Sequence, residues 1–303
     1  MSTESVAIVG AGAVGTALAH ALSAAGISVT AVASRQPAHA EELARATPGA
    51  RAVSVPEAGR SAPIVILTVS DSAIEDACAA LDAPDGALVA HVSGSRDVSA
   101  LEAARANGAD VGGMHPLAAV ARGGAGAAAR GPSPFDGAVF AVEGDEAVTA
   151  RLSALASALG GHPFSIAAAD KPLYHLGASM LAAFATGLSQ LSWEQLRRAS
   201  ASDAVASRGV AHLLRTVADN IGRAAQPAEA LTGPAARGDP GGVARQAAAA
   251  RSLSPEAYAL YRAHARHNIA IAQSAGAIAP DVAERLLGAL REDETTGRGE
   301  DET

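Results

Sequence analysis

Cysteine is nearly absent from this chain of 303 residues, which contains only Cys78. One cysteine excludes an internal disulfide framework and a cysteine-based metal cluster, and we find no zinc-ligand spacing elsewhere, so we expect no metal site. Cys78 lies in a stretch with a helical pattern. We therefore expect it to be a small buried apolar residue and not a nucleophile.

Aromatic residues are also scarce, at 3% of the chain, although 49% of its residues are hydrophobic. The core must therefore be built from alanine, valine and leucine, with close contacts between helices. No apolar run approaches the length that crosses a bilayer, and the first strand pattern begins without a basic segment and apolar signal region before it. These absences predict a cytoplasmic protein that does not bind a membrane.

An excess of basic charge is missing as well, because 23 lysine and arginine residues stand against 31 acidic residues, a net charge of −8. Without basic runs or interleaved aromatic residues, the sequence has no footprint for nucleic acid. Several of the acids lie in residues 292–303, which we expect to form a disordered tail. Any basic pocket must therefore be local.

The most informative segment of the chain reads VAIVGAGAVG, from Val6 to Gly15. A branched apolar run, typical of a strand buried on both faces, leads into the spacing G-x-G-x-x-G and then into a helical pattern. The three glycines permit a tight turn, a close approach of the backbone to a pyrophosphate, and close packing of the helix on the strand. The helix N-terminus would bind the phosphates. The cofactor-binding residues predicted here are Gly10, Ala11, Gly12, Ala13, Val14 and Gly15.

The first half of the chain alternates strand and helix patterns, which predicts an α/β fold with an N-terminal Rossmann-type, doubly wound, mostly parallel sheet. Its last two strands are predicted over residues 135–143 and 164–167. Its second strand, residues 27–33, ends at Ser34 and Arg35, where a carboxylate would bind the 2′-hydroxyl of NAD. A hydroxyl and a fixed cation favour the 2′-phosphate of NADP instead. We therefore predict NADP(H) as the cofactor; the less favoured alternative is that Arg35 is only a surface arginine.

Small and polar residues follow the next two strands. Strand 64–69 leads through Thr68 and Val69 to Ser70, and strand 87–92 is followed by Ser93 and Gly94. Because ligands bind at the carboxyl ends of parallel strands, all five residues are predicted to flank the cofactor. Ser93 is also a catalytic candidate, since its hydroxyl and the adjacent glycine would admit the nicotinamide and a substrate.

Three further polar residues each allow two interpretations. Asp71 could flank the cofactor at the strand end, but we expect it to cap the helix that follows it. His91 is either a hydrogen-bonded core residue or an acid–base group. His115, which ends a strand and is followed by Pro116, is either functional or part of a structural turn.

The second half of the chain is predicted to form an all-helical domain, whose last two helices begin at Pro255 and Pro280. A long helix over residues 170–200 begins with Asp170 as its cap, and Lys171, His175 and Ser179 share one face at i, i+4, i+8 spacing. On a face that meets the cofactor, a partly desolvated lysine or the histidine could protonate a substrate as hydride arrives. Otherwise the lysine is solvated and the histidine packs in the core.

A distinctive loop, LTGPAARGDP, occupies residues 231–240. Arg237 could clamp a substrate carboxylate with Asp239 orienting it, or Asp239 and Pro240 could simply cap the next helix. The predicted boundaries are residues 1–168 for the dinucleotide-binding domain, 169–291 for the helical domain and 292–303 for the tail.

Three motifs together resemble those of a bacterial group of Rossmann-like oxidoreductases whose C-terminal half is a domain of unknown function. They are MHPL at 114–117, KPLYH at 171–175, and LTGP at 231–234 with the following RGD. The resemblance extends to about residue 291. It implies a fold similar to ketopantoate reductase, pyrroline-5-carboxylate reductase and the β-hydroxyacid dehydrogenases, with a homodimer built from the helical domains.

In the β-hydroxyacid dehydrogenases, the helix that opens the second domain carries a catalytic lysine followed four residues later by asparagine. Lys171 and His175 have that spacing, with histidine in place of asparagine. Two further family positions differ, because Ala183 replaces an asparagine and Gln246 a histidine. These differences indicate a specialised substrate or a weakened activity.

The combined prediction is an NADPH-dependent reductase, of ketoacid or imine type, that acts on a C=O or C=N bond of a small carboxylated metabolite. Its candidate catalytic residues are Lys171, His175, Ser93, His115 and Arg237. Two alternatives stay open. The His-Pro pair also suggests a prephenate-type dehydrogenase, and the departures from the family suggest a non-catalytic NADP-binding sensor or assembly protein.

Overall fold

The computed structural model describes residues 5–120 and 133–291, so the predicted tail lies outside the described residues. The chain divides into two compact units, Met1–Leu188 and Ser189–Thr303. The first unit is α/β and the second is helical, which confirms the predicted fold class. The units divide within one long helix, whereas the predicted domain boundary lies just before that helix begins.

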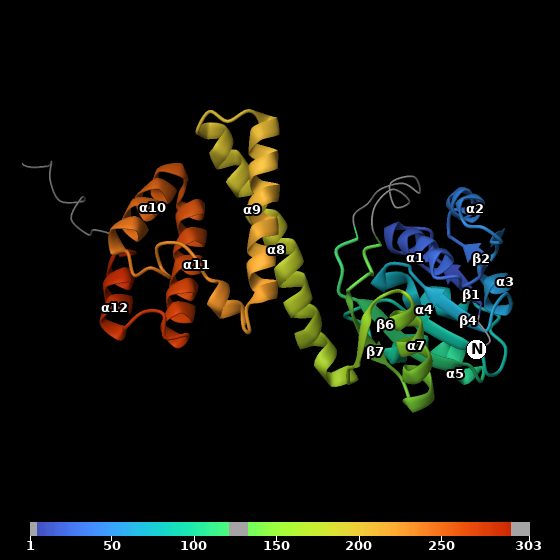
Figure 1. Ribbon diagram of the computed structural model, residues 1–303. Coiled ribbons are helices and arrows are strands. Elements are labelled where there is room, and N and C mark those ends of the chain that lie inside the picture. The colour runs from blue at the N-terminus through green and yellow to red at the C-terminus, as the bar shows by residue number, and fades with distance from the viewer. Residues whose placement is uncertain (1–4, 121–132, 292–303) are drawn as a thin grey trace, which may run out of the picture. The chain divides into compact units, whose positions relative to one another are not determined.

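The first unit is built on an eight-stranded sheet in the order β3-β2-β1-β4-β5-β6-β7-β8. Figure 1 labels several of these strands within the unit. Strands β1 to β6 are parallel, β7 is antiparallel to β6, and β8 is parallel to β7. This arrangement brings the carboxyl ends of β1, β4, β5 and β6 to one edge of the sheet. The strands are β1 (Val6–Val9), β2 (Val29–Ala33), β3 (Arg51–Val53), β4 (Ile64–Leu67), β5 (Leu88–His91), β6 (Asp110–Pro116), β7 (Val139–Glu143) and β8 (His162–Ser165).

Helices cover both faces of this sheet, and two apolar clusters bury their inner sides. One cluster joins the sheet to α1 (Ala13–Ala24), α2 (Pro37–Ala46) and α7 (Glu146–Ala158). The other joins it to α3 (Val55–Arg60), α4 (Ile74–Ala79) and α5 (Glu102–Ala106). Short 3-10 helices η1 (Asp71–Ala73), η2 (Val98–Leu101) and η3 (Ala168–Asp170) follow strand ends. Cys78 of α4 is buried in the second cluster, as predicted, and burial raises the pKa of its thiol.

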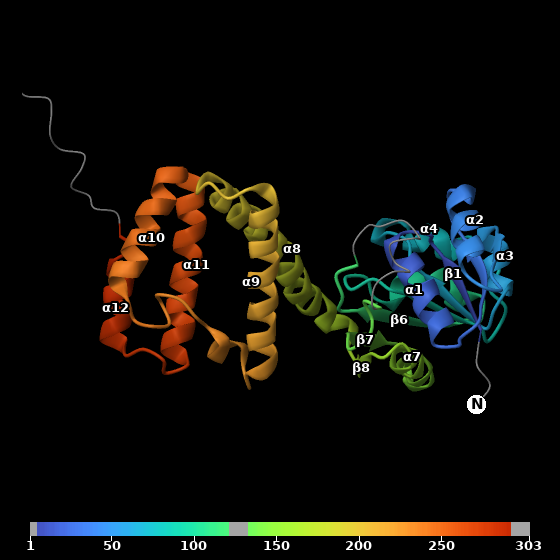
Figure 2. The ribbon, with the colours of Figure 1, turned by 45° about the horizontal axis from the view of Figure 1, so that its top comes forward.

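Helix α8 (Lys171–Arg198) begins in the first unit and ends in the second. The second unit continues with α9 (Asp203–Arg223), η4 (Pro227–Ala230), α10 (Pro240–Leu253), α11 (Pro255–Ser274) and α12 (Pro280–Gly288). Helices α10, α11 and α12 pack side by side around alanine-rich contacts (Figure 2). The expected core of small aliphatic residues is therefore present. None of the described helices is long and apolar enough to cross a bilayer.

Two predicted strands begin elsewhere than expected. The segment predicted as a strand over 135–143 becomes one only at Val139, because Phe135 forms part of a turn and is buried against Phe140. The last strand is His162–Ser165 and not 164–167. Apolar composition alone does not separate a buried turn from a buried strand.

Candidate functional site

The glycine turn after β1 has the geometry that a dinucleotide pyrophosphate requires. Gly10 has a φ of +120°, and a Cβ on Gly15 would lie 1.9 Å from the carbonyl oxygen of Gly10. A Cβ on Gly12 would meet nothing within 4 Å, which leaves open space in front of the turn. Helix α1 then starts without a side-chain cap or an acidic residue in its first turn, so its free N–H groups suit phosphate oxygens. The residues present therefore fit the predicted cofactor.

Thr68, which follows β4, contacts this glycine turn through its side chain. It is buried, and its hydroxyl donates to the carbonyl of Gly10 at 2.6 Å. Its side chain thus holds the turn in place, and its predicted contact with the cofactor stays a prediction. The next residues are more accessible, since Val69 is half-buried and Ser70 is exposed.

At the end of β2, Arg35 is exposed, and among the described residues no carboxylate pairs with its guanidinium. Ser34 is half-buried, and its hydroxyl accepts a hydrogen bond from the backbone of Gln36 at 3.3 Å. Both side chains thus occupy the place predicted for the ribose phosphate, and no acidic side chain follows the strand.

After β5, Ser93 organises the turn that leads to Gly94. It is buried, and its hydroxyl accepts from the backbone N–H groups of Ser95 and Arg96 at 3.2 and 3.0 Å. This hydroxyl therefore holds the loop around Gly94, and its predicted catalytic role stays a prediction.

Asp71 lies beside this turn, and the prediction that it caps a helix is wrong. Neither η1 nor α4 receives a side-chain cap, and a carboxylate oxygen of Asp71 instead accepts from the hydroxyl of Ser95 at 2.5 Å. Burial opposes ionisation of this carboxyl, but the hydrogen bonds from Ser95 and Ser93 outweigh it and lower its pKa. Asp71 is thus an anion at the carboxyl edge of the sheet, where the hydroxyl of Ser95 holds its carboxylate.

Gly94 lies between two histidines that come from distant parts of the chain. A Cβ at Gly94 would lie 2.7 Å from Nδ1 of His175 and 2.8 to 2.9 Å from Cε1 and Nε2 of His115. The two imidazoles contact edge to face, with centroids 6.1 Å apart. Only glycine leaves room for both rings here. The loop after β5, the end of β6 and the beginning of α8 therefore come together at Gly94.

The two rings have different partners. His175 Nε2 hydrogen-bonds to the hydroxyl of Ser179 at 3.2 Å, whereas its Nδ1 is buried and has no hydrogen-bond partner among the described residues. His115 Nδ1 hydrogen-bonds to the hydroxyl of Tyr174 at 2.8 Å. Burial, together with the charges of His175 and Lys171, lowers the pKa of His115 to about 4, so its ring is neutral at physiological pH.

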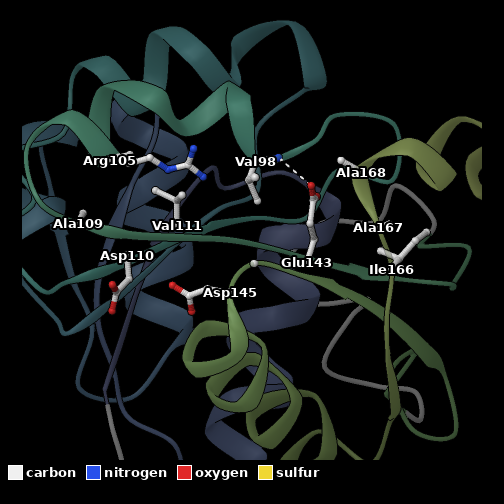
Figure 3. Close-up of a pocket in the computed structure, with 11 residues that line it drawn as sticks. Val98, Arg105, Ala109, Asp110, Val111, Glu143, Asp145, Ile166, Ala167 and Ala168 are labelled. Atoms are coloured by element: carbon white, nitrogen blue, oxygen red, sulfur yellow. Dashed lines mark hydrogen bonds between the residues drawn. The ribbon is translucent and has the colours of Figure 1, made fainter.

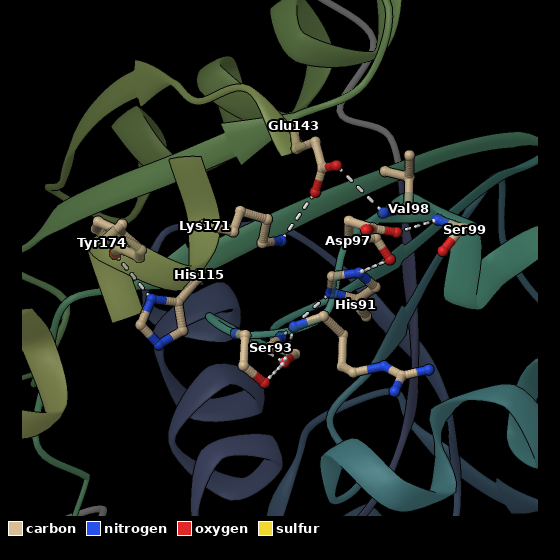
Figure 4. A network of polar contacts seen from close by, with 11 residues as sticks. His91, Ser93, Asp97, Val98, Ser99, His115, Glu143, Lys171 and Tyr174 are labelled. Atoms are coloured by element: carbon tan, nitrogen blue, oxygen red, sulfur yellow. Dashed lines mark hydrogen bonds and ion pairs between the residues drawn. The ribbon is translucent and has the colours of Figure 1, made fainter. Parts of the chain in front are cut away.

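Lys171 is not solvated at the helix start. Its Nζ donates to Oε2 of Glu143 at 2.8 Å, and their side chains are only 3% and 6% exposed. The other oxygen of Glu143 accepts from the backbone N–H of Val98 at 3.2 Å (Figure 4). This ion pair fastens the first residue of α8 to β7 and η2.

His91 is the hydrogen-bonded core residue that one interpretation predicted. It is fully buried, its Nδ1 accepts from the backbone of Ser93, and its Nε2 contacts the carbonyl of Asp97 at 3.1 Å (Figure 4). Because Nδ1 is an acceptor, Nε2 carries the proton and the ring is neutral. Burial, with the nearby charge of Lys171, lowers its pKa accordingly.

Arg237 belongs to the second unit, and its role as a substrate clamp stays a prediction. Asp239 does cap α10, because its carboxylate accepts from the backbone of Gly242 at 2.8 Å, with Pro240 at the first helical position. Its nearest cation is Arg245, at 3.7 Å, and not Arg237. Asp239 therefore starts the helix and does not orient Arg237.

A pocket of about 570 Å³ lies at the amino end of β6 (Figure 3). Arg105, Asp110 and Asp145 line it, and Glu143 forms its inner wall. The charged side chains are already engaged. Asp110 pairs with Arg151, Asp145 caps α7, and Arg105 pairs with Glu102. This pocket therefore offers no free ligand group that matches the chemistry at Gly94.

Two family matches cover separate parts of the chain. Residues 5–94 match the family described as NADP oxidoreductase, coenzyme F420-dependent. Residues 138–268 match a domain of unknown function, DUF2520. The chain thus joins an NADP oxidoreductase domain to that C-terminal domain, as the motifs predicted, and the predicted NADP(H) agrees with the first family. No curated protein matches the sequence.

Solved structures of related fold cover most of the chain. The Bacteroides fragilis protein BF3122 has 23% identity and a TM-score of 0.70, over 88% of this chain and 98% of its own. Pyrroline carboxylate reductase of Plasmodium falciparum, solved with NADP bound, has 13% identity and a TM-score of 0.60, over 96% and 100%. Prephenate dehydrogenase of Aquifex aeolicus has 16% identity and a TM-score of 0.51, over 63% and 70%. These likenesses establish the fold.

Three residues of the site escaped the sequence analysis or were misassigned, namely Glu143, Tyr174 and Asp71. A carboxylate ending an apolar strand was a usable signal for Glu143, because such a residue needs a buried cation. Tyr174 lies between Lys171 and His175, the two residues that the helical spacing singled out. Its contact with His115 depends on the fold and has no local signature.

Proposed function

We propose that this protein is an NADPH-dependent reductase that transfers hydride to a C=O or C=N bond of a small carboxylated metabolite. The observation that carries the proposal is the backbone of Gly94 between the imidazoles of His115 and His175, on the sheet edge that also holds the glycine turn. A neutral ring and an unpartnered ring nitrogen at that edge are suited to binding and protonating an acceptor atom.

We assign the proton donor to His175. Its Nδ1 faces Gly94 without a partner, while Ser179 holds Nε2 and so orients the ring. NADPH, when bound, supplies the hydride, and His175 would deliver the proton from Nδ1 to the oxygen or nitrogen of the reduced bond. His115 would bind an acceptor atom of the substrate through its Nε2 edge.

Lys171 was the other candidate donor, and its contacts argue for a different role. A lysine ion-paired with Glu143 and almost fully buried cannot exchange a proton without breaking the pair. The pair instead supports the helix that carries His175 one turn later. We propose Arg237 as the group that binds the substrate carboxylate, because its planar fork suits that ion.

We also propose that the protein is a homodimer formed through its helices. Leu173, Leu181 and Phe184 of α8 and Leu213 of α9 are all more than half exposed within the chain. Exposed apolar rows of this kind are typical of surfaces that a second protein covers.

The functional test combines cofactor binding with a substrate panel. We expect NADPH to bind more tightly than NADH. A panel of keto acids and cyclic imines is then screened for NADPH oxidation, which is followed by the loss of nicotinamide absorbance. Substituting His175→Gln should lower kcat by about 10²- to 10⁴-fold, the usual contribution of a positioned acid, and leave NADPH affinity unchanged.

Three outcomes would change the proposal. Unaltered kcat in His175→Gln would remove its role as the donor. Binding of NADPH with no consumption across the panel would favour a sensor or assembly protein. Reduction of NADP⁺ by prephenate would favour the dehydrogenase.

A further inference from the structure

Tyr174 is held rigidly next to His115. Its ring packs edge to face against Phe164, with centroids 5.9 Å apart, and against His115, with centroids 5.5 Å apart and planes at 89°. Phe164 comes from β8 and Tyr174 from the first turn of α8. The tyrosine hydroxyl therefore has a fixed position relative to the imidazole (Figure 4).

The hydrogen bond between these rings has a preferred direction. The hydroxyl oxygen of Tyr174 lies 2.8 Å from Nδ1 of His115. A phenol is a stronger acid than a neutral imidazole, and an imidazole nitrogen is a stronger base than a phenol oxygen, so the O–H donates to the ring nitrogen. Burial raises the pKa of Tyr174 to about 12, which keeps that proton on the phenol.

The opposite edge of His115 faces the proposed reaction site. Nε2 and Cε1 are the atoms that a Cβ on Gly94 would meet, at 2.9 and 2.8 Å. Among the described residues, Nε2 has no hydrogen-bond partner. In a neutral imidazole, the bond made by one nitrogen decides which nitrogen carries the hydrogen.

We propose that Tyr174 is a positioning residue that holds His115 in the tautomer protonated on Nε2, so that this N–H points at the substrate beside Gly94. This inference rests on the proposed function and narrows the substrate class. Nε2–H requires a hydrogen-bond acceptor on the substrate, separate from the atom that His175 protonates. A substrate with a carbonyl or carboxylate oxygen next to the reduced carbon meets both requirements.

The tautomer is measurable without any substrate. Histidine labelled with ¹⁵N reports the state of each ring nitrogen by NMR, and the His115 signals are assigned by their loss in His115→Gln. In the wild-type protein we expect a protonated Nε2 and a bare, hydrogen-bonded Nδ1. In Tyr174→Phe, which keeps the aromatic ring but removes the donor, both signals should move toward values averaged over the two tautomers.

Tyr261→Phe is the matched control. It makes the same chemical change in the second unit, where the hydroxyl bonds to Val243 and Gln246, and it should leave the His115 signals unchanged. A wild-type His115 protonated on Nδ1, or identical His115 signals in Tyr174→Phe, would overturn the proposal.

Kinetics supply the second readout. With a substrate found by the panel, Tyr174→Phe should lower kcat by about tenfold, the scale of one neutral hydrogen bond, and leave NADPH affinity unchanged. A weaker NADPH affinity with an unaltered kcat would instead mean that Tyr174 acts on the cofactor site and would refute the assignment. If no substrate is reduced at all, the proposed function fails while the NMR experiment still decides the tautomer.

Discussion

Lys171 and Glu143 bury opposite charges at the point where α8 meets the sheet. Buried ion pairs contribute little net stability, but removing one partner leaves an uncompensated charge. Lys171→Met should therefore lower the free energy of unfolding by about 3–5 kcal/mol, whereas the double substitution Lys171→Met/Glu143→Leu should recover most of this loss. Urea denaturation of the three proteins measures the difference.

The control for this experiment is Arg105→Met. Arg105 pairs with Glu102 at 3.5 Å, but both side chains are largely exposed, so the loss should not exceed about 1 kcal/mol. A double variant no more stable than Lys171→Met would show that the pair acts otherwise than by charge compensation.

His115 gives the protein a pH-dependent stability. Its pKa falls from 6.5 to about 4 on folding, so between these values the unfolded chain binds more protons than the folded one. Stability should therefore decrease as the pH falls from 6.5 toward 4, and the lowered pKa of the buried His91 acts in the same direction. Denaturation at several pH values across this window should show a shallower dependence for His115→Gln than for the wild-type protein.

His39→Gln, at an exposed position on α2, is the comparison variant and should retain the wild-type slope. Equal slopes in the wild-type protein and in His115→Gln would mean that His115 is not held neutral by the fold.

For single residues, the sequence indicated which side chains belong to the candidate site better than it indicated their burial and their hydrogen-bond partners. Helical spacing correctly placed Lys171 and His175 on one helix near a strand end. It could not separate a buried, ion-paired lysine from a solvated one, because Glu143 lies on a strand 28 residues earlier. The misassignment of Asp71 has the same origin, since its partner Ser95 is 24 residues away.

Among the elements, the strands of the first unit were the most predictable. Apolar runs such as Ile64–Leu67 are buried on both faces, and their composition reports this directly. Helix starts marked by proline were also recovered, as at Pro255 and Pro280. Helix α8 begins with Lys171, and Asp170 ends η3, so the predicted start was one residue early.

We expect the end of β2 to carry the preference for NADPH. Arg35 is exposed at that strand end without a carboxylate partner among the described residues, free to pair with a 2′-phosphate. Arg35→Ala should weaken NADPH binding by about 10- to 100-fold, the scale of one charge-assisted hydrogen bond, and leave NADH binding nearly unchanged. Titration of each reduced nucleotide, followed by its fluorescence, measures both affinities.

Arg45→Ala removes an equally exposed arginine from α2 and should alter neither affinity. Parallel losses for NADPH and NADH in Arg35→Ala would place Arg35 against a part of the cofactor that both nucleotides share.

For the molecule as a whole, the sequence predicted the fold class and the joining of an α/β unit to a helical one. The alternating strand and helix patterns and the glycine spacing were sufficient to predict the α/β unit. Each is a local feature of the sequence, because strand burial and the turn from strand to helix depend on neighbouring residues. The expectation of a dimer has no such local signature and came from the resemblance. The structure adds a physical reason for it.

Helices α8 and α9, of 28 and 21 residues, bury almost none of their apolar side chains within the described chain, with Ala206 the one buried hydrophobic residue that they supply. Most helical stability in proteins comes from packing an apolar face, so helices of this length need a covering surface. A second copy of the chain, related by a two-fold axis, can supply the same apolar faces in return. We therefore expect a dimer of the 29.9 kDa chain in size-exclusion chromatography with light scattering.

Leu213→Glu should weaken this dimer by at least about a hundredfold, because a buried unpaired carboxylate costs several kcal/mol. Leu213 is 62% exposed on α9, and Leu260→Glu on α11, at 45% exposure, makes the same change outside the two helices and should leave the dimer intact. A wild-type protein that remains monomeric at high concentration would mean that the apolar rows of α8 and α9 face a different partner. Dissociation by Leu260→Glu instead of Leu213→Glu would move the interface to α11, because the charge would then be buried there.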